Sequence, residues 1–204
     1  MTALRRAVHY PRSRVYVHRL GTHAVRILPG ETYIAADKDE SIVTVLGSCV
    51  SACVRDVKAG IGGMNHFMLP ESETGQWGGM LSEANRYGNF AMEELINKIL
   101  KAGGHRSRLE VKLFGGANFF GGATLIGDKN ASFARRYVKD EALHVAASDL
   151  GGVLGRWICY TPYTGKVARL FLRGTQKAQV AEEERRFGVT LEGQHVGGDV
   201  QLFD

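Results

Sequence analysis

The sequence contains few cysteines and prolines, and it has no long apolar run. Three cysteines among 204 residues make an odd number, and no stretch has the apolar pattern of a secretion signal. Both features predict free thiols in a reducing compartment, which indicates a cytoplasmic location. No apolar run approaches the roughly 20 residues that a membrane-spanning helix needs. We therefore expect no direct membrane insertion.

Signatures of nucleotide and nucleic-acid binding are also missing. The sequence has no phosphate-binding loop with its lysine and no dinucleotide fingerprint. The formal net charge is +5, but no aromatic residues alternate with the basic ones as they do in a base-stacking surface. We expect no nucleic-acid partner, and we interpret the N-terminal arginines as a solvated face or as a docking surface for an acidic protein. These arginines are Arg5, Arg6, Arg12, Arg14, Arg19 and Arg26.

The composition predicts one catalytic domain with a sheet-rich α/β fold. Apolar residues make up 44% of the chain, enough for one sizeable core, and 26 glycines beside four prolines favour many tight turns. Residues 1–14 lack periodicity and are expected to form a basic N-terminal arm, with the domain at 15–204. Helical periodicity predicts helices at 82–102, with Ser82 as N-cap, at 130–142 and, on the surface, at 179–187. Mostly antiparallel strands are expected at 15–20, 24–28, 32–36, 42–46, 50–54, 60–69, 109–114, 144–147, 156–160 and 167–172.

Two of these strands bring a cysteine near a histidine. If Val57 and Lys58 form a two-residue turn, the paired residue numbers sum to 115 and Cys49 lies directly opposite His66. Directly opposed residues have Cβ atoms roughly 4.5–5.5 Å apart. A bulge at one of the glycines between residues 60 and 63 would change this register.

The same register predicts what surrounds the two side chains. Cys49 and His66 share one face of the hairpin, beside a shallow and lightly filled surface, while Val50, Ala52 and Val54 pack on the other face. A glutamine side chain could enter beside the thiol.

A thiol beside an imidazole is suited to nucleophilic catalysis. A neighbouring imidazolium favours the thiolate, which is the reactive form of cysteine. Cys49 follows a glycine and a serine at the end of an apolar strand, where the backbone turns, whereas Cys53 and Cys159 lie inside strands as buried cysteines usually do. By residue type alone, Cys49 and His66 could equally be core residues, and Thr44 could be an ordinary strand former.

Metal binding is a second interpretation of the same residues. Cys49, Cys53 and His66 would provide three ligands, but their spacing lacks the pair of cysteines two residues apart that is typical of structural zinc. We therefore expect no metal.

Residues 44–50 and 62–70 closely resemble the signature of the CheD-type chemoreceptor glutamine deamidases. The two segments read TVLGSCV and GGMNHFMLP, and the spacing from cysteine to histidine also fits. Weaker similarity extends through the helix after Ser82, the segment 112–117, residues 126–127 and the loop 149–156. The resemblance covers roughly residues 30–173.

The resemblance implies a three-layer α/β/β sandwich and a Cys-His-Thr triad at Cys49, His66 and Thr44. It implies an enzyme that hydrolyses glutamine side chains of methyl-accepting chemotaxis receptors to glutamate, through a thioester on the cysteine. No cofactor is required, and a CheC-type phosphatase is implied as a regulatory partner. Two alternatives stay open: a non-catalytic module of the same fold that binds receptors or regulates the phosphatase, and a general cysteine hydrolase such as a protease.

Overall fold

The computed structural model describes residues 13–35, 37–70, 83–118, 126–173 and 175–192. Most of the expected N-terminal arm and the expected N-cap at Ser82 lie outside these ranges. The described residues form strands β1 to β10, helices α1 to α3 and a short 3-10 helix, η1 (Arg106–Arg108). None of the described helices combines the length and the apolar composition needed to cross a membrane.

The strands form two five-stranded sheets. The first has the order β1 (Arg14–Val17), β2 (Thr22–Arg26), β4 (Ser41–Leu46), β9 (Arg156–Thr161), β10 (Lys166–Phe171). The second has the order β3 (Thr32–Ala35), β6 (Ile61–Asn65), β5 (Val50–Asp56), β7 (Leu109–Gly115), β8 (His144–Leu150). Only the pairs β2–β4 and β7–β8 are parallel among the described strands, so the predicted α/β fold with mostly antiparallel strands is confirmed.

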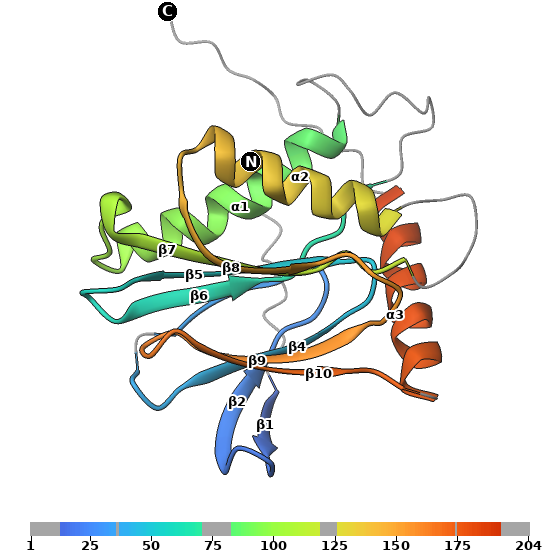
Figure 1. Cartoon of the computed structure of the whole chain (residues 1–204), viewed down its shortest axis with the longest axis horizontal. Coiled ribbons are helices and arrows are strands. Elements are labelled where there is room, and N and C mark those ends of the chain that lie inside the picture. The colour runs from blue at the N-terminus through green and yellow to red at the C-terminus, as the bar shows by residue number, and fades with distance from the viewer. Residues whose placement is uncertain (1–12, 36, 71–82, 119–125, 174, 193–204) are drawn as a thin grey trace, which may run out of the picture.

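Two helices cover the outer face of the second sheet, which gives the order helices, sheet, sheet (Figure 1). They are α1 (Glu83–Lys101) and α2 (Ile126–Asp140). In α1 the buried residues Met92, Leu95, Ile96 and Ile99 follow the spacing of one helical face, and they pack against strand residues such as Val54. A second apolar core fills the space between the two sheets.

The chain passes from the first sheet to the second between β4 and β5. Three residues, 47–49, make this connection, and we call them the crossover loop. Both neighbouring strands are almost fully buried, so the loop is held at the edge of the inter-sheet core. This position brings the crossover loop close to residues of both sheets.

The hairpin of β5 and β6 differs from the prediction. Its loop has four residues, 57–60, and Asp56 pairs with Ile61, so the paired numbers sum to 117 and not to 115. The Asp56 carboxylate accepts hydrogen bonds of 2.8 and 3.0 Å from the backbone N–H groups of Lys58 and Ala59. Gly60 adopts a φ of 68°, which a glycine tolerates and which this longer turn requires.

The two-residue shift changes the partners of the hairpin residues but leaves their faces as predicted. Cys49 is a diagonal neighbour of His66, because the bridge between Val50 and Phe67 sets the pairing at this end. Side chains alternate with a period of two, so a shift of two residues keeps each side chain on its original face. Val50 packs toward the helices, and Cys49 lies in the core between the sheets.

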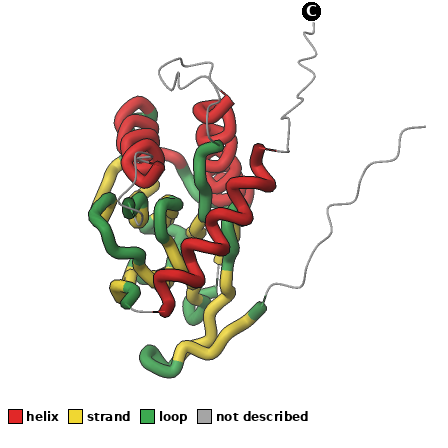
Figure 2. Tube along the Cα trace, turned by 90° about the vertical axis from the view of Figure 1, so that its right-hand side faces the viewer, coloured by secondary structure: helices red, strands yellow, loops and turns green. Residues whose placement is uncertain are grey.

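Helix α3 (Thr175–Glu192) is longer than the predicted segment 179–187. It crosses one end of the sandwich, where it lies across strand ends of both sheets (Figures 1 and 2). The sequence predicts a short surface helix here, but α3 reaches the crossover loop through Glu184.

Candidate active site

The backbone of the crossover loop is oriented by hydrogen bonds to its carbonyl groups. The carbonyls of Gly47 and Cys49 accept N–H bonds of 2.7 Å from Ala117 and Gly116, respectively. The Ser48 carbonyl accepts a bond of 2.9 Å from the Nδ2 of Asn130. With the carbonyls fixed on this side, the N–H groups of the three residues are directed at one common partner, the carboxylate of Glu184.

Glycine at two positions lets the end of β7 approach the crossover loop and α2 closely. Gly115 has a φ of 114°, and a Cβ atom there would lie 2.1 Å from the carbonyl oxygen of Cys49. Gly116 has a φ of 68°, and a Cβ atom there would lie 2.9 Å from the carbonyl oxygen of Gly127 in α2. Together these glycines allow the backbone contact that holds the cysteine.

The carboxylate of Glu184 occupies the space in front of the loop. Its Oε1 accepts N–H bonds from Gly47 at 2.8 Å and from Cys49 at 3.1 Å. Its Oε2 accepts the N–H of Ser48 at 2.8 Å and the hydroxyl of Ser48 at 2.7 Å. Three successive N–H groups that converge in this way form an anion-binding cradle.

His66 is bound to Thr44 of the opposite sheet. The Thr44 hydroxyl donates to the carbonyl of Ile27 at 2.8 Å and lies 2.8 Å from the Nδ1 of His66. A hydroxyl has only one hydrogen, so Thr44 must accept from Nδ1–H. His66 therefore carries its proton on Nδ1, and its Nε2 has a free lone pair. This Nε2 is buried without a hydrogen-bond partner in the described part of the protein.

The structure brings together the thiol, the imidazole and the carboxylate. One ligand atom each of Cys49, His66 and Glu184 lie within 4.8 Å of one another. Such a group could hold a metal ion. The Glu184 oxygens, however, already accept four hydrogen bonds, so their surroundings are suited to binding a carboxylate and not to presenting it to a metal. Cys53, the third ligand of the metal interpretation, is not in this cluster.

Burial sets the protonation of the site. Burial, together with the adjacent Glu184 carboxylate, raises the pKa of the Cys49 thiol well above its ordinary value. Burial and the positive charge of Arg26 lower the pKa of His66 to about 3. In this arrangement the pair is a neutral thiol and a neutral imidazole, and not the thiolate and imidazolium expected from the sequence.

The surroundings of Cys49 also differ from the expected shallow surface. Cys49 is 0% exposed, and the Glu184 side chain of α3 lies beside the thiol. A groove of about 340 Å³ nevertheless approaches the site between α1 and α3, and His66 forms part of its wall.

Three buried polar residues of this region are not predicted by the sequence. Asn130 was expected at the start of its helix, but α2 begins four residues earlier and the Asn130 side chain bridges Ser48 and the N–H of Leu69. Arg156 donates to the carbonyl of Gly115 at 2.6 Å and so supports the end of β7. Glu184 was placed on a surface helix. Each is polar in a segment where polar residues are usually solvated, so only the tertiary contacts reveal them.

Fold and site together define a class of protein: an α/β sandwich with a buried thiol, a neutral imidazole and an anion cradle where its two sheets meet. Sequence comparison gives the family. The family described as CheD chemotactic sensory transduction matches residues 68–169, which is half of the chain. The chain belongs to the CheD family.

Curated relatives match over more of the chain than the family model does. The relative from Hahella chejuensis is 47% identical over 94% of this chain and 90% of its own length. Those from Rhodopseudomonas palustris and Hydrogenovibrio crunogenus are each 46% identical, over 91% and 90% of this chain and 86% and 95% of their own lengths. All three are named "probable chemoreceptor glutamine deamidase CheD".

Proposed function

We propose that this protein hydrolyses glutamine side chains of chemoreceptors to glutamate through a thioester on Cys49. The names of its relatives support the reaction and the class of substrate. The observation that carries the proposal is the cradle of the crossover loop. It holds a side-chain carboxylate, the chemical product of glutamine hydrolysis, close to a thiol and an imidazole.

The first half of the reaction forms the thioester. Nε2 of His66 takes the thiol proton of Cys49 as the sulfur attacks the carboxamide carbon, and a carbon–sulfur bond forms. The oxygen becomes an oxyanion that the N–H groups of residues 47–49 hold, an interaction that stabilises this type of transition state strongly. His66 then gives its proton to the nitrogen, the carbon–nitrogen bond breaks, and ammonia leaves.

The second half releases glutamate. Nε2 of His66 takes a proton from water, the resulting oxygen nucleophile attacks the thioester, and the oxyanion again forms in the cradle. The carbon–sulfur bond breaks, and the proton returns to the sulfur. Thr44 contributes by position, since it accepts Nδ1–H and so keeps Nε2 free for both proton transfers.

The test is mass spectrometry of purified receptors after incubation with the protein. We expect a mass increase of about one dalton per converted glutamine, because an NH₂ group is replaced by OH. Cys49→Ala and His66→Ala should each reduce conversion by about 10³-fold or more, and combining them should cost little beyond either single change. Cys53→Ala is the matched control, because it removes a buried thiol from the same region without touching the cradle.

The outcomes separate the alternatives. New receptor fragments would indicate a protease. Unchanged receptor mass with every variant, together with retained receptor binding, would indicate a non-catalytic module. The CheC-type phosphatase stays a predicted partner, to be tested by binding.

A further inference from the structure

Helix α3 contacts the rest of the protein through one narrow stripe. Its buried side chains are Val180, Ala181, Glu184 and Leu191, which recur at helical spacing along one face. Most of the other described side chains of α3 are exposed or half-buried. The helix is therefore attached by a few apolar contacts, by the ion pair of Glu183 with Arg26 on its partly exposed side, and by one buried carboxylate.

That carboxylate is unusual in its surroundings. Burial of an ionised group costs free energy unless partners replace its hydration, and no basic side chain forms an ion pair with Glu184 in the described part of the chain. Its partners are the backbone N–H groups and the hydroxyl of the crossover loop. These are the donors that the proposed reaction needs for its oxyanion.

We propose that α3 occupies the substrate-binding surface of this enzyme, with Glu184 in the place of the product carboxylate, so that a glutamine-bearing helix of the substrate must displace α3 to react. The inference rests on the proposed function. It defines an interaction surface with three parts. These are the crossover loop, the groove lined by His66, and the surface against which the buried side chains of α3 pack.

The chemistry of this surface fits a helix with a single carboxamide at its centre. Next to Glu184, one turn away on either side, α3 carries the small residues Ala181 and Gly188, which let the helix approach closely. A Cβ atom at Gly188 would lie 3.3 Å from Cε of Met68. The groove of about 340 Å³ beside Phe187 continues this surface along the wall formed by His66.

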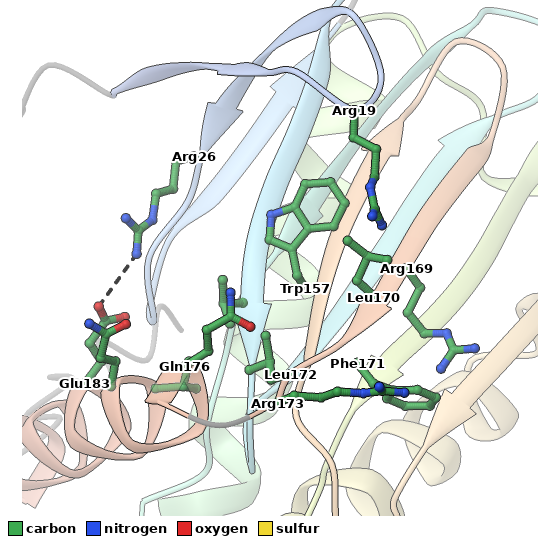
Figure 3. Close-up of a pocket in the computed structure, with 13 residues that line it drawn as sticks. Arg19, Arg26, Trp157, Arg169, Leu170, Phe171, Leu172, Arg173, Gln176 and Glu183 are labelled. Carbon is green, nitrogen blue, oxygen red and sulfur yellow. Dashed lines mark ion pairs between the residues drawn. The ribbon is translucent and has the colours of Figure 1, made fainter.

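A basic groove on the other side of α3 gives an acidic partner a place to start displacing the helix. The groove measures about 870 Å³ and lies between α3 and the first sheet (Figure 3). Arg26 in its wall pairs with Glu183 of α3 at 3.6 Å, and both side chains are partly exposed. An acidic surface that bound Arg26 would remove this contact. The remaining guanidinium groups of the groove belong to Arg19, Arg169 and Arg173.

The first test measures the accessibility of Cys49 and not its activity. Alkylation by iodoacetamide at neutral pH should be about tenfold or more faster in Glu184→Ala than in the unchanged full-length protein, because the thiol loses its cover and its adjacent negative charge. Glu182→Ala is the matched control, since it removes the same charge from α3 but its ion pairs are with Arg185 and Arg186 of the same helix. We expect no change in the control.

A second variant separates exposure from charge. Val180→Asp keeps Glu184 but weakens the apolar contact of α3 with Leu172, and it should also accelerate alkylation of Cys49. Faster alkylation in Glu184→Ala alone would show an electrostatic effect without displacement and would overturn the inference. Unchanged alkylation in both variants would overturn it as well.

The third test places a substrate group in the cradle. Glu184→Gln puts a carboxamide at this position, and Cys49 should hydrolyse it to a carboxylate with loss of ammonia, a gain of about one dalton in the mass of the α3 peptide. The same change combined with Cys49→Ala should keep the amide. If the amide persists while receptor glutamines are converted, the inference is wrong. If receptor glutamines are not converted by any variant, the proposed function fails instead.

Discussion

The single hydroxyl hydrogen of Thr44 decides which nitrogen of His66 can act as a base. That hydrogen is directed to the Ile27 carbonyl, so the hydroxyl oxygen accepts from Nδ1–H. Thr44 is therefore hydrogen-bonded to His66, and Cys49 lies within 4.8 Å of the imidazole. The Cys-His-Thr triad that the resemblance implies stays a prediction. Thr44 has no contact with substrate in this proposal, and it acts as a positioning residue for the imidazole.

Thr44→Val should reduce kcat and leave KM nearly unchanged. Valine keeps the shape but cannot accept from Nδ1–H, so the imidazole loses its preferred tautomer, and we expect kcat to fall by about 10- to 100-fold. Steady-state kinetics of receptor deamidation across a pH series would measure this, and Thr44→Ser should restore most of the activity.

Ser41→Ala provides the control for Thr44→Val. Ser41 lies on the same strand, and its hydroxyl is 2.8 Å from that of Thr161, far from the imidazole. Loss of this bond should cost about 1 kcal/mol of stability and leave kcat unchanged. If Thr44→Val altered stability alone, as the control does, Thr44 would be a structural residue.

At the scale of elements, α2 supports the crossover loop through Asn130. This side chain is fully buried, and its oxygen accepts from the Leu69 N–H while its nitrogen donates to the Ser48 carbonyl, each at 2.9 Å. One residue of a helix thus fixes both the cradle and the segment that follows His66.

Asn130→Ala should weaken both stability and catalysis. It leaves the buried N–H of Leu69 without a partner, a loss of about 1–3 kcal/mol, and the partly buried Ser48 carbonyl without one, which costs less. The loosened crossover loop should also hold the oxyanion less well, so kcat should fall. Denaturant unfolding and kinetics would measure the two effects. Asn89→Ala, at an exposed position of α1, should change neither one.

At the scale of the whole molecule, burial of a neutral histidine makes folding depend on pH. The pKa of His66 falls from an ordinary value of 6.5 to about 3 in the folded protein. Between these values the unfolded chain binds a proton that the folded protein does not, so acid favours unfolding. The stability contributed by neutral His66 is complete above pH 6.5 and is lost as the pH falls toward 3.

We therefore expect the protein to lose up to about 1.4 kcal/mol of unfolding free energy per pH unit below pH 6.5 on account of His66. His66→Gln should flatten this part of the profile when unfolding is followed by denaturant titration between pH 7 and 4.5. The pKa of Asp56 is held well below its usual range by the hydrogen bond from Arg108, so its contribution is lost only below about pH 3.8. An unchanged slope in the variant would mean that folding does not lower the pKa of His66.

Local patterns in the sequence predict the class of fold, most elements and the faces of the central hairpin. Apolar periodicity is a local property, and its period of two keeps Cys49 on the inter-sheet face even though the predicted register was two residues away from the observed one. The observed register is set by the four-residue turn, which the hydrogen bonds to the Asp56 carboxylate and the positive φ of Gly60 stabilise.

The contents of the site depend on contacts that form only in the folded chain. Glu184 follows Cys49 by 135 residues and Asn130 follows Ser48 by 82, so no local pattern relates either pair. The polarity of Glu184 and Asn130 predicts that they lie on solvated helix surfaces. The local sequence does not show which backbone N–H groups of a distant segment need a partner in the folded protein. Only when the two sheets and α3 meet does a glutamate become the partner of three N–H groups beside a thiol.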